Sequence, residues 1–408
     1  MAKANVFILL CLELTFRSCN SEFTPVIKTN SGSLRGQTCR ILGKPIFKYL
    51  GVPYATPPVG NLRFGKPLAV GQWDGVYEAT EQPLPCVQKI KYSPYPWKTN
   101  QSESSEDCLY LNIWTPELIG TGELRPVLVW IYGGSFTHGS IDIDFYDGSV
   151  LSAYGDVVVA SMNYRVGLFG FLNAGTKSCP GNMGLHDQLL AMKWIKENIE
   201  FFGGDPKRIT LFGESAGAIS IGAHLVSPLS RGLFARAILQ SGSLYGPIVK
   251  GRDGLSGRSK VSEISKHVGC LNDEDVDIEN MVKCLKTVPA EELLGAAKEK
   301  RGDFGPTFGD DYIPIDPNEA FKTGSFQNVE LLIGANRDEG SHFLPSMFPQ
   351  IFDRRNDETD DVTKGNAALY MEMIFRNFPD IESELVAQFY LQNISVDDHV
   401  IVFILIFL

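Results

Sequence analysis

A serine between glycines stands at residues 213–217, with the sequence GESAG. This fits the G-x-S-x-G pattern, in which a sharp turn from a strand to a helix exposes a nucleophilic serine. An apolar run at residues 209–212 precedes it and a helix-compatible stretch at residues 216–225 follows it. The flanking glycines relieve the strained turn, and the helix N-terminus favours a developing oxyanion. The alternative is a helix-capping serine beside packing glycines, and we predict that Ser215 is a nucleophile.

A glycine pair follows another apolar run. Residues 127–131 read as a strand, and Gly133 and Gly134 come directly after it in the sequence YGGSF. Such a loop lets backbone N–H groups approach a substrate closely, which an oxyanion hole requires. An ordinary tight turn is the alternative, and the nearby serine motif favours the oxyanion hole.

The elements that must position these groups alternate between strand and helix. Five apolar runs read as buried strands: residues 127–131, 157–160, 209–212, 237–239 and 331–333. The clearest helix is expected at residues 187–199, and Gly203 and Gly204, which follow it, prevent it from continuing. This alternation predicts an α/β fold with a large, mostly parallel sheet flanked by helices, and sites form at the carboxyl ends of its strands. Residues 251–299 read as a helical insertion, and the charge run at residues 353–361 as a solvated loop or helix start.

Composition excludes several kinds of partner. The chain has 408 residues, of which 44% are hydrophobic and 21% charged, and its net charge is -11. This is ordinary globular composition. Without a basic stripe, nucleic acid is not an expected partner. The sequence contains no run of eighteen apolar residues, so it predicts no transmembrane helix. We expect no metal and no organic cofactor.

The first 21 residues read as a secretory signal peptide. Lys3 supplies positive charge, and residues 6–12 form a short apolar core. The alternative is a buried first strand or helix. Secretion would permit disulfides, although spacing alone does not fix how the cysteines pair. Asn100 and Asn393 begin glycosylation sequons, which fits a secreted chain.

Two stretches carry a family resemblance. They are residues 106–116, with the sequence EDCLYLNIWTP, and residues 202–217, which run from FGGDP to GESAG. With these, the chain resembles the type-B carboxylesterase and cholinesterase family of α/β-hydrolases, from about residue 24 to about residue 390. Supporting segments lie at residues 51–55, 163–165, 181–185, 240–243 and 338–341. The resemblance implies an α/β-hydrolase domain over residues 22–399, followed by an atypical apolar tail at residues 400–408.

The resemblance also assigns roles to residues. Ser215 matches the nucleophile and Glu339 the acid of a catalytic triad. Gly134, Ser135 and Ala216 match the oxyanion-hole donors, although glycine is usual where Ser135 stands, so its side chain would narrow the acyl pocket.

Further positions follow from the same resemblance. Trp97 and Glu214 are expected to contact substrate. Trp97 lies where cholinesterases keep a tryptophan for quaternary ammonium, although it could instead pack its own loop. The disulfides implied are Cys86–Cys108 and Cys270–Cys284, which leaves Cys39 and Cys179 free.

The base of the triad is missing from its expected place. In this family the chain order is serine, acid, histidine. His342 follows Glu339 by only three residues, and His399 is followed by an apolar tail rather than by glycine. We therefore expect a chain that is C-terminally truncated before the histidine loop.

Two functions are compatible with these residues. The first is a secreted carboxylic ester hydrolase that acts on a small-molecule ester through an acyl-enzyme. Its activity in this chain is uncertain without the histidine loop, and its substrate is either a choline ester or a neutral ester. The alternative is a non-catalytic, cholinesterase-like binding or adhesion protein.

Overall fold

The computed structural model describes residues 17–89, 99, 101–116, 123–245, 250–251, 255–271, 277–297, 304–337, 339, 368–369, 372 and 382–392. Its internal contacts divide the chain into two units, Met1–Ile333 and Gly334–Leu408. Each unit is described by itself.

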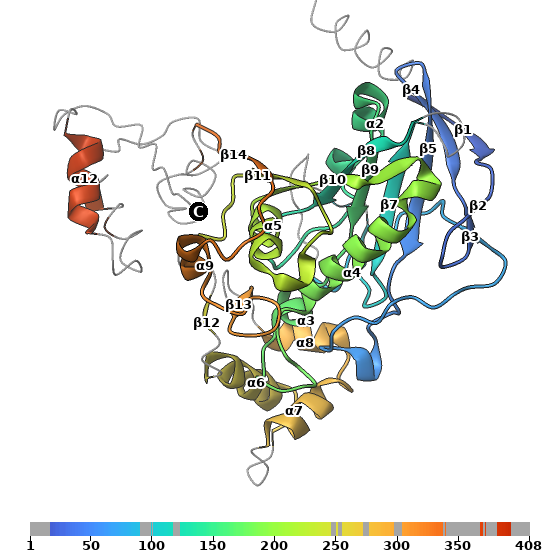
Figure 1. Ribbon diagram of the computed structural model, residues 1–408. Coiled ribbons are helices and arrows are strands. Elements are labelled where there is room, and N and C mark those ends of the chain that lie inside the picture. Colours follow the sequence, from blue (N-terminus) through green and yellow to red (C-terminus); the bar gives the residue numbers. More distant parts are fainter. Residues whose placement is uncertain are drawn as a thin grey trace, which may run out of the picture. The chain divides into compact units, whose positions relative to one another are not determined.

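The described residues form a central sheet of nine strands (Figure 1). Its order is β1 (Arg17–Phe23), β4 (Gln37–Ile41), β5 (Lys44–Pro53), β7 (Tyr110–Thr115), β9 (Val158–Met162), β8 (Arg125–Ile131), β10 (Gly204–Glu214), β11 (Arg236–Gln240) and β14 (Glu330–Gly334). The strands β9, β8, β10 and β11 are parallel neighbours. The pairs from β1 to β9 are antiparallel. The parallel part carries both glycine motifs at strand ends.

The other elements are shorter or lie outside the sheet. Small sheets are formed by β2 (Ile27–Lys28), β3 (Ser33–Arg35) and β6 (Val76–Glu78), and by β12 (Lys250–Gly251) and β13 (Thr307–Phe308). The α-helices are α2 (Ser149–Gly155), α3 (Gly167–Phe171), α4 (Met183–Asn198), α5 (Ala216–Val226), α6 (Leu255–His267), α7 (Ile278–Leu285), α8 (Ala290–Ala297), α9 (Pro317–Thr323) and α12 (Ser383–Leu391). Single 3-10 turns are η1 (Gly60–Leu62), η2 (Asp144–Tyr146), η3 (Ile199–Phe202) and η4 (Pro228–Ser230).

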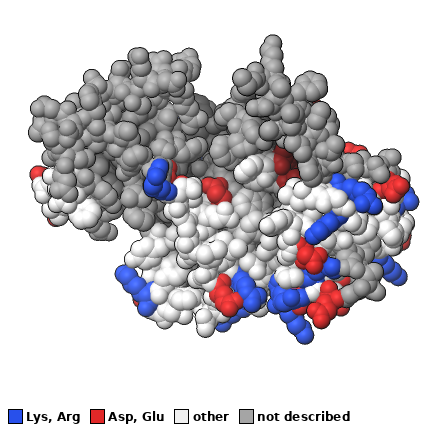
Figure 2. All heavy atoms as spheres, turned by 90° about the horizontal axis from the view of Figure 1, so that it is seen from above, with Lys and Arg blue, Asp and Glu red and all other residues white. Residues whose placement is uncertain are grey.

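Charged side chains of both signs share the described surface. On the face in Figure 2, Lys and Arg lie interspersed with Asp and Glu rather than in a field of one sign. In the described part of the chain, no helix is both long and apolar enough to cross a membrane.

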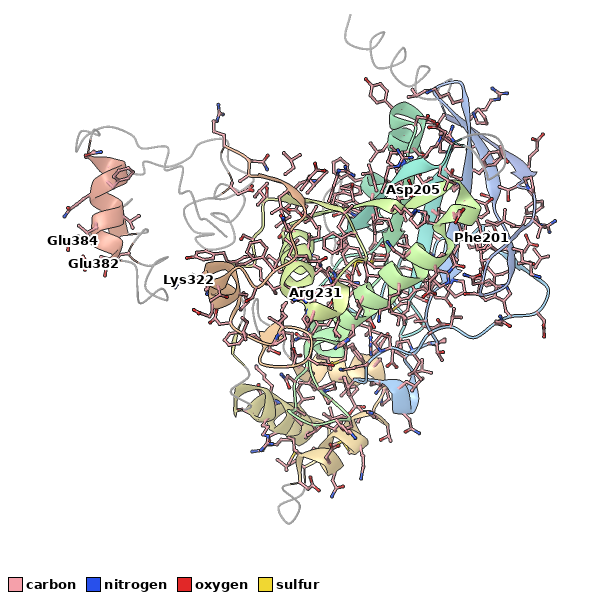
Figure 3. All side chains as sticks on the ribbon, viewed as in Figure 1. Phe201, Asp205, Arg231, Lys322, Glu382 and Glu384 are labelled. Atoms are coloured by element: carbon pink, nitrogen blue, oxygen red, sulfur yellow. A yellow bond between two sulfur atoms is a disulfide. The ribbon has the colours of Figure 1, made fainter. Side chains whose placement is uncertain are left out.

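Helices cover both faces of the sheet. Along β7, Ile113 belongs to the main apolar core, whereas Trp114 belongs to a second cluster that includes Ala153 of α2. Successive strand residues point to opposite faces, so these two clusters lie on opposite sides of the sheet. The main core also receives the apolar residues of α4 and α5. Side chains fill these layers in Figure 3, where Phe201 of η3 and Asp205 of β10 are labelled.

The structure confirms the predicted α/β fold, and each predicted strand occurs, with differences at its ends. The run at residues 331–333 was expected to be buried, and this was wrong, because β14 is exposed along its whole length. The helix expected at residues 187–199 begins earlier, at Met183. The sequence did not indicate this start, because almost all of α4 is buried and no polar face marks its first turn. The expected helical insertion contains α6, α7 and α8. The antiparallel strands β1, β4 and β5 were not predicted, because their sequences lack long apolar runs. The charge run at residues 353–361 lies outside the described residues.

Two disulfides occur as the resemblance implied. They are Cys86–Cys108 and Cys270–Cys284. Cys179 is free and buried. The expectation of a free Cys39 was wrong, because Cys39 is disulfide-bonded. It lies in β4 opposite β1, and β1 begins inside the segment that the sequence assigned to a signal peptide.

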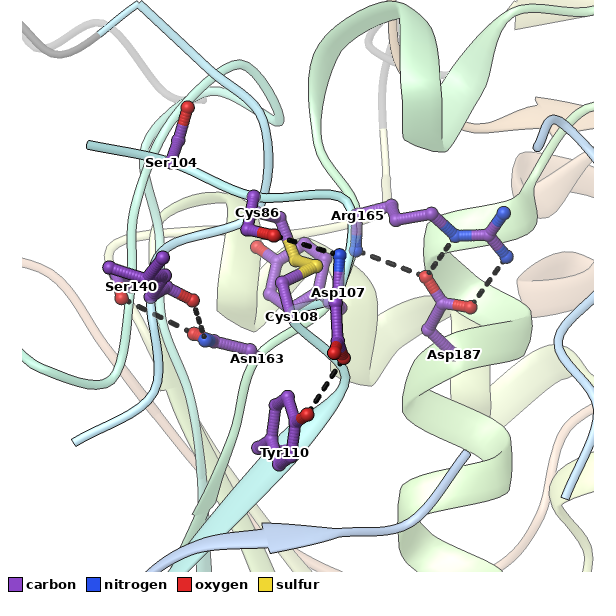
Figure 4. Close-up of a disulfide and its surroundings, with 12 residues drawn as sticks. Cys86, Ser104, Asp107, Cys108, Tyr110, Ser140, Asn163, Arg165 and Asp187 are labelled. Carbon is purple, nitrogen blue, oxygen red and sulfur yellow. Dashed lines mark hydrogen bonds and ion pairs between the residues drawn. A yellow bond between two sulfur atoms is a disulfide. The ribbon is translucent and has the colours of Figure 1, made fainter. Parts of the chain in front are cut away.

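A buried ion pair fixes α4 against the loop after β9. The Arg165 guanidinium donates from Nε and Nη2 to the Asp187 carboxylate at 2.8 and 2.7 Å, and the Arg165 backbone N–H donates to the same carboxylate at 3.0 Å (Figure 4). The two side chains are 4% and 0% exposed. Such a pair gains little over apolar packing, but losing one partner leaves an uncompensated charge in the core.

We predict that Arg165→Met lowers the free energy of unfolding by about 3–5 kcal/mol, because Asp187 then stays buried without its partner. Urea denaturation followed by far-UV circular dichroism measures this change. The matched control is Arg125→Met, which removes the more exposed ion pair with Asp156 and should cost about 1 kcal/mol or less. Equal costs for the two variants would contradict the importance of the buried pair.

Candidate active site

Ser215 has the strained backbone that a nucleophile elbow requires. It lies between β10 and α5 with φ 52° and ψ -119°. Residues with side chains seldom adopt such angles, and they do so where the surrounding structure enforces them. The Ser215 N–H donates to Gln240 O at 2.9 Å, and the Ser215 carbonyl accepts from Ile219 N at 2.9 Å. The serine is therefore held by the end of β11 on one side and by the first turn of α5 on the other.

The glycines of the motif are required by the neighbouring strand. A Cβ on Gly217 would lie 2.0 Å from the carbonyl oxygen of Ile131, and a Cβ on Gly213 would lie 2.7 Å from the same oxygen. Real Cβ atoms do not approach backbone oxygen so closely. The last residue of β8 thus packs directly against both ends of the elbow, and α5 behind it is buried along its whole length.

The glycine loop after β8 lies beside the serine. A Cβ on Gly133 would stand 3.0 Å from the Ser215 Cβ and 2.6 Å from the Glu214 carbonyl oxygen. Gly134 has φ 117°, and Ser135 and Phe136 follow with φ 55° and 60°. The structure thus brings together the two motifs that the sequence singled out, although Gly133 and Ser215 lie 82 positions apart in the chain.

The expected oxyanion-hole donors have unused N–H groups. Within the described part of the chain, the backbone N–H groups of Gly134, Ser135 and Ala216 donate to no acceptor. Ala216 stands at the first position of α5, where a helix has no internal acceptor to offer. These N–H groups are available for an anionic oxygen bound next to Ser215.

Glu214 lies under the glycine loop. Its Oε2 would be 2.7 Å from a Cβ on Gly133. Burial and then the nearby Glu214 carboxylate raise the pKa of Tyr146. The structure therefore places the Glu214 carboxylate beside the glycine loop.

Glu339 belongs to the second unit. Its Oε2 accepts from Asn336 Nδ2 at 3.2 Å. Its Oε1 is shielded from solvent and has no hydrogen-bond partner in the described part of the chain. A carboxylate with one oxygen unused has the capacity to orient another donor, as the acid of a triad does.

No described histidine is hydrogen-bonded to the Ser215 hydroxyl, which makes no hydrogen bond within the described residues. His138 lies against the glycine loop, with its Nδ1 3.0 Å from Thr137 Oγ1. His267 is exposed on α6, and its Nδ1 is 2.8 Å from Glu263 O. His342 and His399 lie outside the described residues. So do Trp97 and the sequon residues Asn100 and Asn393.

A buried polar chain that the sequence did not predict runs behind the elbow. Gln188 Nε2 donates to Ser220 Oγ at 3.1 Å, and Ser220 Oγ donates to Ala216 O at 2.9 Å. Gln188 Oε1 therefore accepts from His224 Nε2 at 3.0 Å. The other ring nitrogen, Nδ1, lies 2.6 Å from the Tyr312 hydroxyl and 3.1 Å from Ser230 Oγ. His224 is held neutral by this arrangement, and burial lowers its pKa to about 3. Both ring nitrogens of His224 are therefore engaged in buried hydrogen bonds, so this histidine has a structural role although it lies close to the elbow in sequence.

The lowered pKa of His224 predicts a loss of stability in acid. An ordinary histidine has a pKa near 6.5, so below that pH the unfolded chain binds a proton that folded His224 refuses. The resulting stability is complete above about pH 6.5 and declines as the pH falls toward 3. We predict that the loss of unfolding free energy between about pH 7.5 and pH 5 is smaller by about 2 kcal/mol in His224→Gln than in the parent chain.

Urea denaturation at the two pH values measures this difference. His267→Gln, which replaces an exposed histidine, is the control and should behave as the parent chain does. An unchanged pH dependence in His224→Gln would show that another group causes the acid sensitivity.

The parallel sheet, the strained serine at its carboxyl edge and the adjacent glycine loop define an α/β-hydrolase fold. A family model described as the carboxylesterase family matches residues 23–400. The chain belongs to the carboxylesterase family.

Named relatives agree with this membership. The chain is 40% identical over 388 residues to acetylcholinesterase-1 of Trittame loki, covering 92% of this chain and 69% of the relative. It is 37% identical over 399 residues to cholinesterase of Mus musculus, covering 94% of this chain and 64% of the relative. It is 36% identical over 392 residues to acetylcholinesterase of Leptinotarsa decemlineata, covering 88% of this chain and 61% of the relative. The chain therefore spans roughly two thirds of the length of these relatives.

Proposed function

We propose that the protein is a serine carboxylic ester hydrolase whose nucleophile is Ser215. The observation that carries the proposal is the pairing of the strained serine with unused N–H groups of Gly134, Ser135 and Ala216. A nucleophile beside preorganised donors is what acyl transfer requires, since the donors stabilise the oxyanion of the tetrahedral intermediate.

The reaction proceeds in two steps. The Ser215 Oγ attacks the ester carbonyl carbon and loses its proton to a histidine base, while the carbonyl oxygen becomes an oxyanion that the three N–H groups stabilise. The alcohol leaves with that proton, and the acyl group stays on Ser215. Water then attacks the acyl-enzyme, releases the acid and restores the serine. Glu339 is proposed to orient the histidine. The sequence predicts no base at its expected place, so the complete cycle is proposed for a form of the protein that carries the histidine loop.

Secretion is proposed alongside this activity. The disulfides Cys86–Cys108 and Cys270–Cys284 fit an oxidising compartment. Glycosylation proposed at Asn100 and Asn393 fits the same location. The signal peptide proposed at residues 1–21 fits it too, but its removal would take residues 17–21 of β1 with it.

We predict that a fluorophosphonate probe adds once to the 408-residue chain, on Ser215. Mass spectrometry of the intact protein and of its peptides measures the adduct. Ser215→Ala should remove the adduct and lower ester hydrolysis on the order of a thousandfold or more. Ser325→Ala, at an exposed serine outside the motif, should label as the parent chain does.

The other outcomes are also informative. An adduct that persists in Ser215→Ala would contradict the assignment of the nucleophile. A folded chain that takes up no probe and hydrolyses no simple aryl ester, yet binds a partner, would favour the alternative, which is a non-catalytic binding or adhesion protein on the same fold.

The proposed substrate is a choline ester of a small acid. Three relatives are named as cholinesterases or acetylcholinesterases. In addition, Trp97 is proposed to stack on the quaternary ammonium, and Glu214 places a negative charge beside the glycine loop. The side chain of Ser135, where the family usually has glycine, is proposed to narrow the acyl pocket.

We predict that a form of the protein that carries the histidine loop hydrolyses acetylcholine with a lower KM than the neutral isostere 3,3-dimethylbutyl acetate. Trp97→Ala should raise the KM for acetylcholine about tenfold and leave that for the neutral ester nearly unchanged, because only the cation gains from the indole face. Steady-state kinetics with both esters measure the difference. Equal losses for the two esters would assign Trp97 to packing of its loop and the protein to general carboxylesterases.

A further inference from the structure

The side chain of Gln88 pairs with the backbone of Gly139, at the end of the glycine loop. Gln88 Nε2 donates to Gly139 O at 2.8 Å, and Gly139 N donates to Gln88 Oε1 at 2.9 Å. The side-chain amide of Gln88 thus bonds to both the backbone N–H and the backbone carbonyl of Gly139, in the way that a paired β-strand bonds to its neighbour. Gln88 is only 8% exposed, so these bonds are shielded from competing water.

The loop that ends at Gly139 has a backbone that needs external support. Gly134, Ser135, Phe136 and Gly139 all have positive φ, with values of 117°, 55°, 60° and 127°. For residues other than glycine such angles cost on the order of 1–3 kcal/mol each and persist only when neighbouring groups enforce them. A Cβ on Gly139 would lie 2.7 Å from Gly133 O. The point that Gln88 holds is therefore also the point where the loop returns to its own start.

Gln88 is itself firmly placed. Its Nε2 also donates to Cys86 O at 3.0 Å, and Cys86 is bonded to Cys108. The backbone carbonyl of Gln88 accepts from Ser104 Oγ at 3.4 Å. Ser104 lies in the same disulfide-closed segment, where the chain returns toward Cys108. Cys86, Cys108 and Ser104 are labelled in Figure 4. The disulfide-closed segment thereby supplies a fixed donor and acceptor to a strained loop far along the chain.

We propose that Gln88 is a positioning residue that aims the N–H groups of Gly134 and Ser135 at the reacting carbonyl. This inference rests on the proposed function, because it assigns those N–H groups to the oxyanion. Gln88 touches no reacting atom and acts through the loop. Small errors in the position of such donors lower the rate steeply, whereas ground-state binding of the ester depends on other contacts.

The test compares Gln88→Leu and Gln88→Glu with the parent chain. The leucine removes both bonds to Gly139. The glutamate keeps an oxygen that can accept from Gly139 N but replaces the donor with an oxygen that repels Gly139 O. Gln72→Glu is the matched control, since Gln72 is exposed and, within the described residues, its amide donates only to Asn30 O at 3.3 Å.

Two measurements are made on each variant of the full chain. The first is steady-state hydrolysis of 4-nitrophenyl acetate. We expect kcat to fall about 10- to 100-fold in both Gln88 variants with KM changed less than about threefold, and the control to match the parent. The second is amide hydrogen exchange of peptides covering residues 132–142, followed by mass spectrometry. We expect exchange there to accelerate about tenfold or more in Gln88→Leu, and exchange in residues 216–226 to remain unchanged.

Each outcome decides between roles. Accelerated exchange across the whole chain with equal effects on kcat and KM would overturn the inference in favour of a general structural role. Parent-like kcat or parent-like exchange of the loop in folded Gln88→Leu would also overturn it. If the parent chain hydrolyses no ester, as the missing histidine loop allows, labelling of Ser215 by the fluorophosphonate tests the proposed function, and the exchange measurement decides whether Gln88 holds the loop.

Discussion

The carbonyl oxygen of Ile131 limits how closely β8 and the serine elbow can pack against each other. It ends β8 and lies so near Gly213 and Gly217 that neither position has room for a side chain. Because β8 and β10 are paired in parallel up to this point, their register fixes where the strand turns into the helix. The unusual backbone of Ser215 follows from this crowding, and so does the position of the glycine loop, which leaves β8 immediately afterwards. Loss of either glycine would force the elbow away from the loop.

Strain on both sides of the serine is balanced by buried polar contacts. The elbow is held by backbone bonds to β11 and α5, and α5 is held from behind by the chain of Gln188, Ser220 and His224. The glycine loop is held at its end by Gln88. Buried polar groups of this kind are costly unless all are satisfied, and once satisfied they specify one arrangement. The site therefore depends on residues that touch no substrate.

Short-range patterns made much of this fold predictable. The strands that carry the site are continuous apolar runs, and the glycines that flank Ser215 announce a turn, so the elbow and the glycine loop could be predicted from neighbouring residues. The start of α4 could not, because a helix buried on every side loses the amphipathic signal at its first turn. The bond between Gln88 and Gly139 joins residues 51 positions apart, and no local pattern encodes it. Cys39 was misjudged because its strand partner β1 begins within the segment read as a signal peptide.

The central claim is that the elbow and the glycine loop form one oxyanion-binding site. The most direct measurement is a crystal structure of the 408-residue chain after reaction with an organophosphonate, whose P–O group mimics the tetrahedral intermediate. The account predicts phosphorus bonded to Ser215 Oγ and the phosphoryl oxygen within about 2.7–3.1 Å of the backbone nitrogens of Gly134, Ser135 and Ala216. A phosphoryl oxygen directed to solvent, away from all three nitrogens, would contradict it.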